Sequence, residues 1–215
     1  MDDTEGRIEH TVLGPLTTWT DVTAVLDDAA EYGMRACVPP CYVEATREYA
    51  PDVAVSTVVG FPHGQHTTET KCTEATQAWK AGADEIDLVP NLGLAVAGDL
   101  AAFESELEEI AAAVPVPVKV ILEAPFFEEP QLRELAEVAA GTDIDFLKTS
   151  TGFTEGGATV SDVELLAEYA KVKASGGVGS WAFAAELFAA GADRIGASSG
   201  DVIVEEYRGQ ADPDS

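Results

Sequence analysis

The stretch DFLKTSTGF, residues 145–153, places Lys148 at the end of a short apolar run, directly before a Thr-Ser-Thr-Gly turn. An apolar run bounded by turn residues is typical of a buried strand. Burial of an ammonium group is costly unless the group is paired or loses its proton. The stretch therefore predicts a core strand that ends on a chemically active lysine.

Seven further apolar segments lie on either side of this strand, and segments with helical periodicity separate them. Eight β-then-α units in 215 residues predict an α/β protein with one domain, a compact (β/α)₈ TIM barrel. An open doubly wound sheet is the alternative, but no G-x-G-x-x-G motif follows the first strand. The expected strands are 8–13, 34–38, 53–59, 85–89, 118–122, 144–148, 170–174 and 194–196, and the expected helices include 67–81, 100–113, 131–140, 160–169 and 180–190.

No linker or low-complexity segment divides the chain. We expect one barrel domain over residues 7–208, with flexible ends at 1–6 and 209–215. No apolar run approaches the roughly 18 residues that a membrane span needs. The stretch MDDTEGRIEH at 1–10 is acidic and lacks the features of a secretory signal, so we expect a cytoplasmic protein.

Acidic residues outnumber basic ones by 39 to 12, for a net charge of −27. This sign argues against a nucleic-acid binder. The acids are spread along the chain, so they repel one another at low salt, whereas at about 1 M salt the Debye length falls to about 3 Å. The composition suggests a halophilic protein adapted to a high-salt cytoplasm, and an ordinary acidic protein is the alternative.

Three of the six lysines, Lys119, Lys148 and Lys173, fall in expected strands, whereas Lys71 and Lys80 fall on an expected helix, where solvation is the usual outcome. Neighbouring parallel strands lie about 4.8 Å apart. If Lys148 and Lys173 both point into the barrel mouth, each cation disfavours the other and one pKa falls. A neutral lysine amine attacks carbonyl groups and forms a Schiff base. Lysines that point outward or pair with carboxylates remain the alternative.

The segment DEIDLVP, residues 84–90, supplies a carboxylate at a strand end. If the parity is right, Asp87 faces the site and acts as a general acid and base, or it is simply an ion-pair partner. Asp84 and Glu85 are expected to serve the turn and the strand base. Lys119 lies deeper in its strand, where we expect it to pair with an acid in a supporting role.

The last two loops resemble a phosphate cradle. The stretches SGGV at 175–178 and GASSG at 196–200 follow the seventh and eighth expected strands, and Ser198 and Ser199 open a helix. Barrels often bind phosphate here through backbone N–H groups. Ordinary turn chemistry is the alternative.

The histidines and cysteines show no metal-binding pattern. His10 is expected to be a core or strand-end histidine and His66 to cap a helix, and neither receives a catalytic role. Cys37 and Cys41 have no His or Cys cluster beside them, so we expect buried, inert thiols and no metal.

Taken together, these stretches resemble deoxyribose-phosphate aldolase. The resemblance covers nearly the whole chain in the family's order. The matching stretches are IEHTVLGP, ACVPPCYV, VVGFPHG, TETKCTEA, GADEIDLVPNLG, VKVILE, DFLKTSTGF, GGATVSDVELL, VKASGGV and RIGASSG.

The resemblance implies a class I, Schiff-base-forming lyase without a metal or other cofactor. Its substrate is a phosphorylated sugar, 2-deoxy-D-ribose 5-phosphate, which it cleaves reversibly to D-glyceraldehyde 3-phosphate and acetaldehyde in deoxyribose catabolism. It also implies a homo-oligomer, a dimer or larger. By the matching motifs, Lys148 is the Schiff-base lysine, Lys173 the lysine that lowers its pKa, and Asp87 the proton relay. The residues implied to contact phosphate are Gly152, Gly176, Gly177, Gly196, Ser198 and Ser199.

Four positions depart from the family pattern. Gly14 stands near the place where a lysine often follows the Thr-Leu-Leu-type run. Glu9 stands where the family usually has Asp, Gly179 where many members have Arg, and Phe153 where some have a lysine beside the phosphate. Phosphate binding would then rest mostly on backbone amides. Two other activities remain open: a Schiff-base aldolase with a different donor, and a barrel that binds or isomerises a phosphorylated ligand without covalent catalysis.

Overall fold

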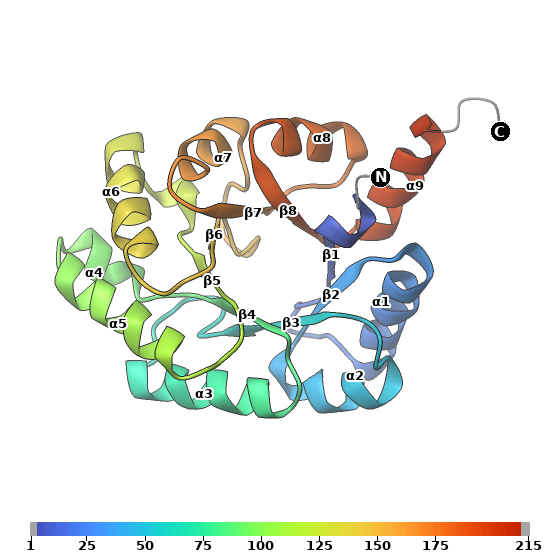
Figure 1. Ribbon diagram of the computed structural model, residues 1–215, viewed down its shortest axis with the longest axis horizontal. Helices are drawn as coiled ribbons and strands as arrows, with labels where there is room; N and C mark the ends of the chain where they lie inside the picture. Colours follow the sequence, from blue (N-terminus) through green and yellow to red (C-terminus); the bar gives the residue numbers. More distant parts are fainter. Residues whose placement is uncertain (1–3, 212–215) are drawn as a thin grey trace.

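The computed structural model describes residues 4–211, which form a closed barrel of eight parallel strands in sequential order. Figure 1 shows the strands around the centre and the helices as an outer ring. The first and last strands pair with each other and close the sheet, so the predicted (β/α)₈ fold is confirmed. The strands are β1 (Ile8–Thr11), β2 (Arg35–Val38), β3 (Val55–Val59), β4 (Glu85–Leu88), β5 (Val118–Ile121), β6 (Phe146–Lys148), β7 (Lys171–Ser175) and β8 (Ala192–Ala197).

The helices pack their apolar faces against the outside of the barrel. No helix of residues 4–211 is long and apolar enough to cross a membrane. Three short 3₁₀ helices, η1 (Glu5–Arg7), η2 (Pro40–Tyr42) and η3 (Ala124–Phe126), accompany the α-helices. The α-helices are α1 (Trp19–Tyr32), α2 (Val43–Tyr49), α3 (Thr68–Lys80), α4 (Leu92–Val96), α5 (Leu100–Ala112), α6 (Glu129–Ala140), α7 (Val160–Leu166), α8 (Trp181–Ala189) and α9 (Gly200–Ala211).

Side-chain caps start most of these helices. The Thr18 hydroxyl accepts the Asp21 N–H in a capping box at the start of α1, and Gly33, with φ 77°, ends that helix. The expected cap at His66 is wrong, because the hydroxyl of Thr67 accepts the Thr70 N–H and begins α3 one residue later.

The folded part extends further at both ends than the expected boundaries at 7 and 208. Thr4 is buried, and Glu5–Arg7 form η1. The Arg7 guanidinium donates to two carbonyl groups of β8, at 2.7 and 2.9 Å, and Arg208 pairs with Glu5 at 3.3 Å. Helix α9 continues to Ala211. The remainder of the two expected flexible ends, residues 1–3 and 212–215, lies outside the described residues.

Lys71 on α3 is fully buried, and the expectation that it is solvated is wrong. Its Nζ lies 2.9 Å from Glu106 Oε1, on the neighbouring helix α5, while Glu106 Oε2 accepts the N–H of Asn91 at 2.7 Å. A buried ammonium persists here because a buried carboxylate faces it. Lys80, the last residue of the same helix, is exposed as expected.

Lys71→Met should lower the free energy of unfolding by about 3–5 kcal/mol, because Glu106 loses its buried cation. Urea denaturation at one fixed salt concentration measures this loss. Lys80→Met is the matched control and should change stability by less than about 0.5 kcal/mol. The double variant Lys71→Met with Glu106→Leu should recover most of the loss; equal stability of Lys71→Met and the wild type would contradict the assignment.

Candidate active site

The register of the barrel brings the predicted ionisable residues together. Lys148 on β6 is the direct partner of Lys173 on β7, and Asp87 on β4 is the partner of Lys119 on β5. All four side chains are buried. Because residues in register on neighbouring strands share a face, both pairs project into the barrel interior.

Asp87 lies between the three lysines. Its Oδ2 accepts from Lys148 Nζ at 2.7 Å and from Lys173 Nζ at 2.8 Å, and its Oδ1 accepts from Lys119 Nζ at 2.9 Å. The alternation of side chains along β4 thus places this carboxylate inside the barrel. One carboxylate oxygen links the two lysines that the sequence placed at neighbouring strand ends, so a proton can pass between them without leaving the site.

Glu9 on β1 is a second buried carboxylate, and it was not among the predicted site residues. Its Oε2 accepts from Lys173, and its Oε1 lies 3.2 Å from Lys119 Nζ and 3.1 Å from Arg194 Nη1. The strand sequence IEHT has only one apolar residue, so the signal that singled out the lysines is absent at Glu9.

Glu85 and Lys119 form the layer beneath. Glu85 Oε2 lies 2.7 Å from Lys119 Nζ and 2.6 Å from Arg194 Nη1, and Glu85 Oε1 lies 2.7 Å from Arg35 Nη2. Asp84 holds the turn before β4, where its carboxylate accepts the N–H of Val55 at 2.7 Å. Lys119 therefore balances the charge of the three acids, and its supporting role stays a prediction.

The pKa values of the three lysines are shifted in different directions. The pKa of Lys148 is lowered, first because burial disfavours its charge and then because the Lys173 cation is close, against the opposing effect of Asp87. The pKa of Lys173 is raised: burial lowers it, but Asp87 and Glu9 outweigh burial. The pKa of Lys119 is also raised, because Asp87 and Glu9 again outweigh burial. Lys148 is thus the lysine that gives up its proton most readily.

Both inner carboxylates remain ionised. Burial alone would raise the pKa of Asp87, but Lys119, Lys148 and Lys173 hold it well below its usual range. Burial acts in the same way on Glu9, and Lys119 and Lys173 lower its pKa. The site therefore combines one readily neutralised amine with fixed anions and a fixed cation at Lys173.

A cavity of about 390 Å³ opens at the carboxyl ends of β1, β6, β7 and β8. Lys148 is the one cation among the described residues that line it. Of the six residues implied to bind phosphate, five line this cavity and Ser199 does not. The lining residues are Thr11, Val12, Leu13, Gly14, Thr17, Lys148, Thr151, Gly152, Phe153, Ser175, Gly176, Gly177, Val178, Gly196, Ala197 and Ser198.

Two glycines are required by the geometry of this cavity. Gly176 has φ 94°, and a Cβ there would lie 3.0 Å from Gly157 Cα. A Cβ on Gly196 would lie 2.8 Å from Lys173 Cε, so glycine is what allows β8 to pass beside the lysine. The loops offer backbone N–H groups and the Ser198 hydroxyl, and no side-chain cation of the described residues lines this end.

Glu123 is a further residue that the sequence did not identify. Its backbone is left-handed, with φ 50°, and its Oε1 accepts the N–H of Thr151 at 3.1 Å and the hydroxyl of Thr154 at 3.0 Å. A non-glycine residue in this conformation is strained unless its surroundings hold it. Glu123 therefore fixes the turn that follows Lys148.

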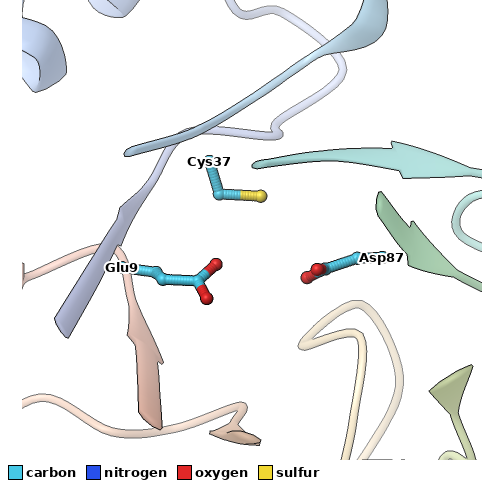
Figure 2. Close-up of side chains that lie close together, drawn as sticks. All are labelled: Glu9, Cys37 and Asp87. Atoms are coloured by element: carbon cyan, nitrogen blue, oxygen red, sulfur yellow. The ribbon is translucent and has the colours of Figure 1, made fainter. Parts of the chain in front are cut away.

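Glu9, Cys37 and Asp87 point toward one another inside the barrel (Figure 2), with their potential ligand atoms within 4.8 Å. Lysine ammonium groups already bond to both carboxylates. Burial raises the pKa of the Cys37 thiol to about 11, so sulfur keeps its proton. Because ammonium groups occupy this donor set, it does not fit a divalent cation.

Comparisons with known proteins show the family of this barrel. The model of the DeoC/LacD family of aldolases matches residues 8–204. The chain belongs to this family. The DeoC/LacD match includes β1, which carries Glu9, and β8, which ends at the cavity, so it covers every residue of the candidate site.

Individual DeoC/LacD relatives match over nearly the full chain. A deoxyribose-phosphate aldolase of Natronomonas pharaonis is 61% identical, over 96% of this chain and 95% of its own. A solved aldolase named QR15 is 34% identical, with a TM-score of 0.95 and complete coverage of both chains. The deoxyribose phosphate aldolase from Aeropyrum pernix, described as tetrameric, is 34% identical with a TM-score of 0.89, over 97% of this chain and 92% of its own.

Proposed function

We propose that this chain cleaves 2-deoxy-D-ribose 5-phosphate reversibly to D-glyceraldehyde 3-phosphate and acetaldehyde. The observation that carries the proposal is the position of Lys148, which lines the cavity, has a lowered pKa and shares Asp87 with a second, protonated lysine. The relatives named deoxyribose-phosphate aldolase, one of them 61% identical, support the choice of substrate.

In the first step the neutral amine of Lys148 attacks C1 of the open-chain aldehyde. The carbinolamine that forms loses its hydroxyl group as water and leaves an iminium ion. Asp87, bonded to Lys148 and Lys173, is placed to accept the proton that the amine releases and return one to the departing hydroxyl, directly or through water.

In the second step the bond between C2 and C3 breaks. The C3 hydroxyl gives its proton to a base, for which Asp87 acting through water is our candidate, and C3 becomes the aldehyde of glyceraldehyde 3-phosphate. The electron pair of the broken bond enters the iminium and forms an enamine. Protonation of the enamine at C2 and hydrolysis of the resulting iminium release acetaldehyde and free Lys148.

Lys173 acts as a fixed cation in this scheme. It disfavours a second positive charge on Lys148, and it holds Asp87 and Glu9 ionised. The 5-phosphate of the substrate binds to the N–H groups of Gly152, Gly176 and Gly177 and to the turn from Gly196 to Ser199. This assignment needs no metal or organic cofactor.

The proposal is tested by incubating the protein in molar salt with deoxyribose 5-phosphate and measuring both products. Deoxyribose, ribose 5-phosphate and other phosphorylated aldehydes form the comparison panel. We expect stoichiometric acetaldehyde and glyceraldehyde 3-phosphate from deoxyribose 5-phosphate. Turnover of another sugar at a higher kcat/KM would assign a different substrate to the same site.

Salt should stabilise the protein. With a net charge of −27, lowering salt from about 2 M to about 0.1 M lengthens the Debye length from a few Å to about 10 Å and restores repulsion between the acids. The melting temperature, read by circular dichroism in potassium chloride, should fall steadily. An unchanged melting temperature would contradict adaptation to a high-salt cytoplasm.

We also infer a homo-oligomer, dimer or larger, by analogy with the relative described as tetrameric. Large apolar side chains lie exposed on the described surface at Leu16, Val96 and Phe126, and each is a candidate contact. Light scattering in molar salt measures the oligomeric state of the protein.

A further inference from the structure

His10 on β1 is buried between two helices and has no part in the steps above. Its Nδ1 accepts the N–H of Gly200, the first residue of α9, at 3.1 Å. Its Nε2 lies 3.4 Å from Asp28 Oδ2 on α1. One imidazole thus joins the barrel wall to the start of α9 and to α1.

The acceptor role of Nδ1 fixes the tautomer of the ring. A nitrogen that accepts a hydrogen bond carries no proton, so the ring proton of neutral His10 lies on Nε2. The carboxylate of Asp28 faces Nε2 and favours the proton there. Asp28 therefore keeps Nδ1 free to accept from Gly200.

The position of His10 couples it to the end of β8. His10 is the register partner of Ala197, which lines the substrate cavity together with Gly196 and Ser198. Gly200 follows this turn two residues after Ser198. A Cβ on Gly200 would lie 2.9 Å from His10 Nδ1, so the backbone packs directly on the ring.

The bond also removes one donor from the expected phosphate cradle. The sequence suggested that the start of the last helix supplies N–H groups to phosphate. The Gly200 N–H is already taken by His10, so a phosphate must use N–H groups earlier in the turn. The direction of those groups depends on where Gly200 is held.

We propose that His10 is a positioning residue for the phosphate-binding turn 196–199, and that it acts through the N–H of Gly200. This inference rests on the proposed function, because it assumes that the cavity binds the 5-phosphate of the sugar. The polar partners of His10 are Gly200 and Asp28 and not Lys148 or Asp87, so its effect falls on substrate binding and not on the chemical steps.

The test compares deoxyribose 5-phosphate with deoxyribose, which lacks the phosphate, in molar salt. His10→Leu removes the acceptor and should raise KM for the phosphorylated sugar about tenfold, the effect of roughly 1.4 kcal/mol for one lost hydrogen bond. Its kcat, the pH profile of kcat and kcat/KM for deoxyribose should stay unchanged. His10→Asn places an amide oxygen near the position of Nδ1 and should bring KM for the phosphorylated sugar back close to the wild-type value.

A second variant covers the case in which His10→Leu does not fold. Gly200→Ala presses its Cβ on the ring and should raise KM for the phosphorylated sugar alone. Equal losses on both sugars in the folded variants, or an unchanged KM for the phosphorylated sugar, would overturn the inference. A wild type that does not prefer the phosphorylated sugar would instead overturn the phosphate site of the proposed function, and the inference with it.

Discussion

Lys148→Ala is expected to abolish cleavage of deoxyribose 5-phosphate, with a fall in kcat of about 10³-fold or more. The amine is the atom that forms the covalent bond to substrate, and neither neighbouring lysine can replace it. Lys119 and Lys173 do not line the cavity, and their pKa values are raised by Asp87 and Glu9. A coupled assay for acetaldehyde in molar salt measures the fall.

Lys80→Ala is the matched control for this variant, because Lys80 is an exposed lysine on α3. It should keep wild-type kcat and KM. Lys148→Ala should also remain folded, since replacing a buried ammonium by a small apolar group relieves desolvation while Lys119 and Lys173 still neutralise Asp87. Normal turnover by a folded Lys148→Ala protein would assign the nucleophile elsewhere.

Lys173→Leu is expected to slow cleavage at pH 7 by on the order of 10²-fold and to shift the pH optimum upward. Loss of the Lys173 cation removes one cause of the lowered pKa of Lys148. It also leaves Asp87 with fewer cations, so the carboxylate holds the Lys148 proton more tightly. Both effects raise the pKa of Lys148, and each unit of increase lowers the neutral fraction near neutral pH about tenfold.

The pH profile of kcat/KM separates this effect from general damage. Activity of Lys173→Leu should rise with pH until it passes the new pKa of Lys148, while Lys171→Leu, an exposed position on the same strand, should show the wild-type profile. The free energy of unfolding should also fall by about 3–5 kcal/mol, because Glu9 and Asp87 lose a buried partner. A profile with unchanged midpoint would contradict the role given to Lys173.

The sequence was sufficient to predict the barrel because most strands carry buried apolar residues in short segments that helical segments separate. All eight expected strands are present, and no strand end is displaced by more than two residues, as at β1 and β8. It also singled out Lys148, Lys173 and Asp87, because ionisable groups inside apolar strands are conspicuous. The register places Lys148 and Lys173 side by side on β6 and β7, and Asp87 reaches both lysines from β4.

Other parts of the site depend on contacts between segments far apart in sequence. Lys71 is on a helix of mixed polarity, and its burial depends on Glu106, 35 residues away. The role of Glu123 depends on its left-handed backbone, which no local motif indicates. His10 meets Gly200 only when β1 and β8 close the barrel.

Trapping of the Schiff base tests the central claim most directly. The protein is incubated in molar salt at pH 7 with deoxyribose 5-phosphate and sodium borohydride, and peptides are then mapped by mass spectrometry. We predict a reduced adduct on Lys148, absent without substrate and absent from Lys148→Ala. A fully active protein with no adduct, or an adduct confined to Lys173 or Lys119, would contradict the assignment of Lys148 as the amine that bonds to substrate.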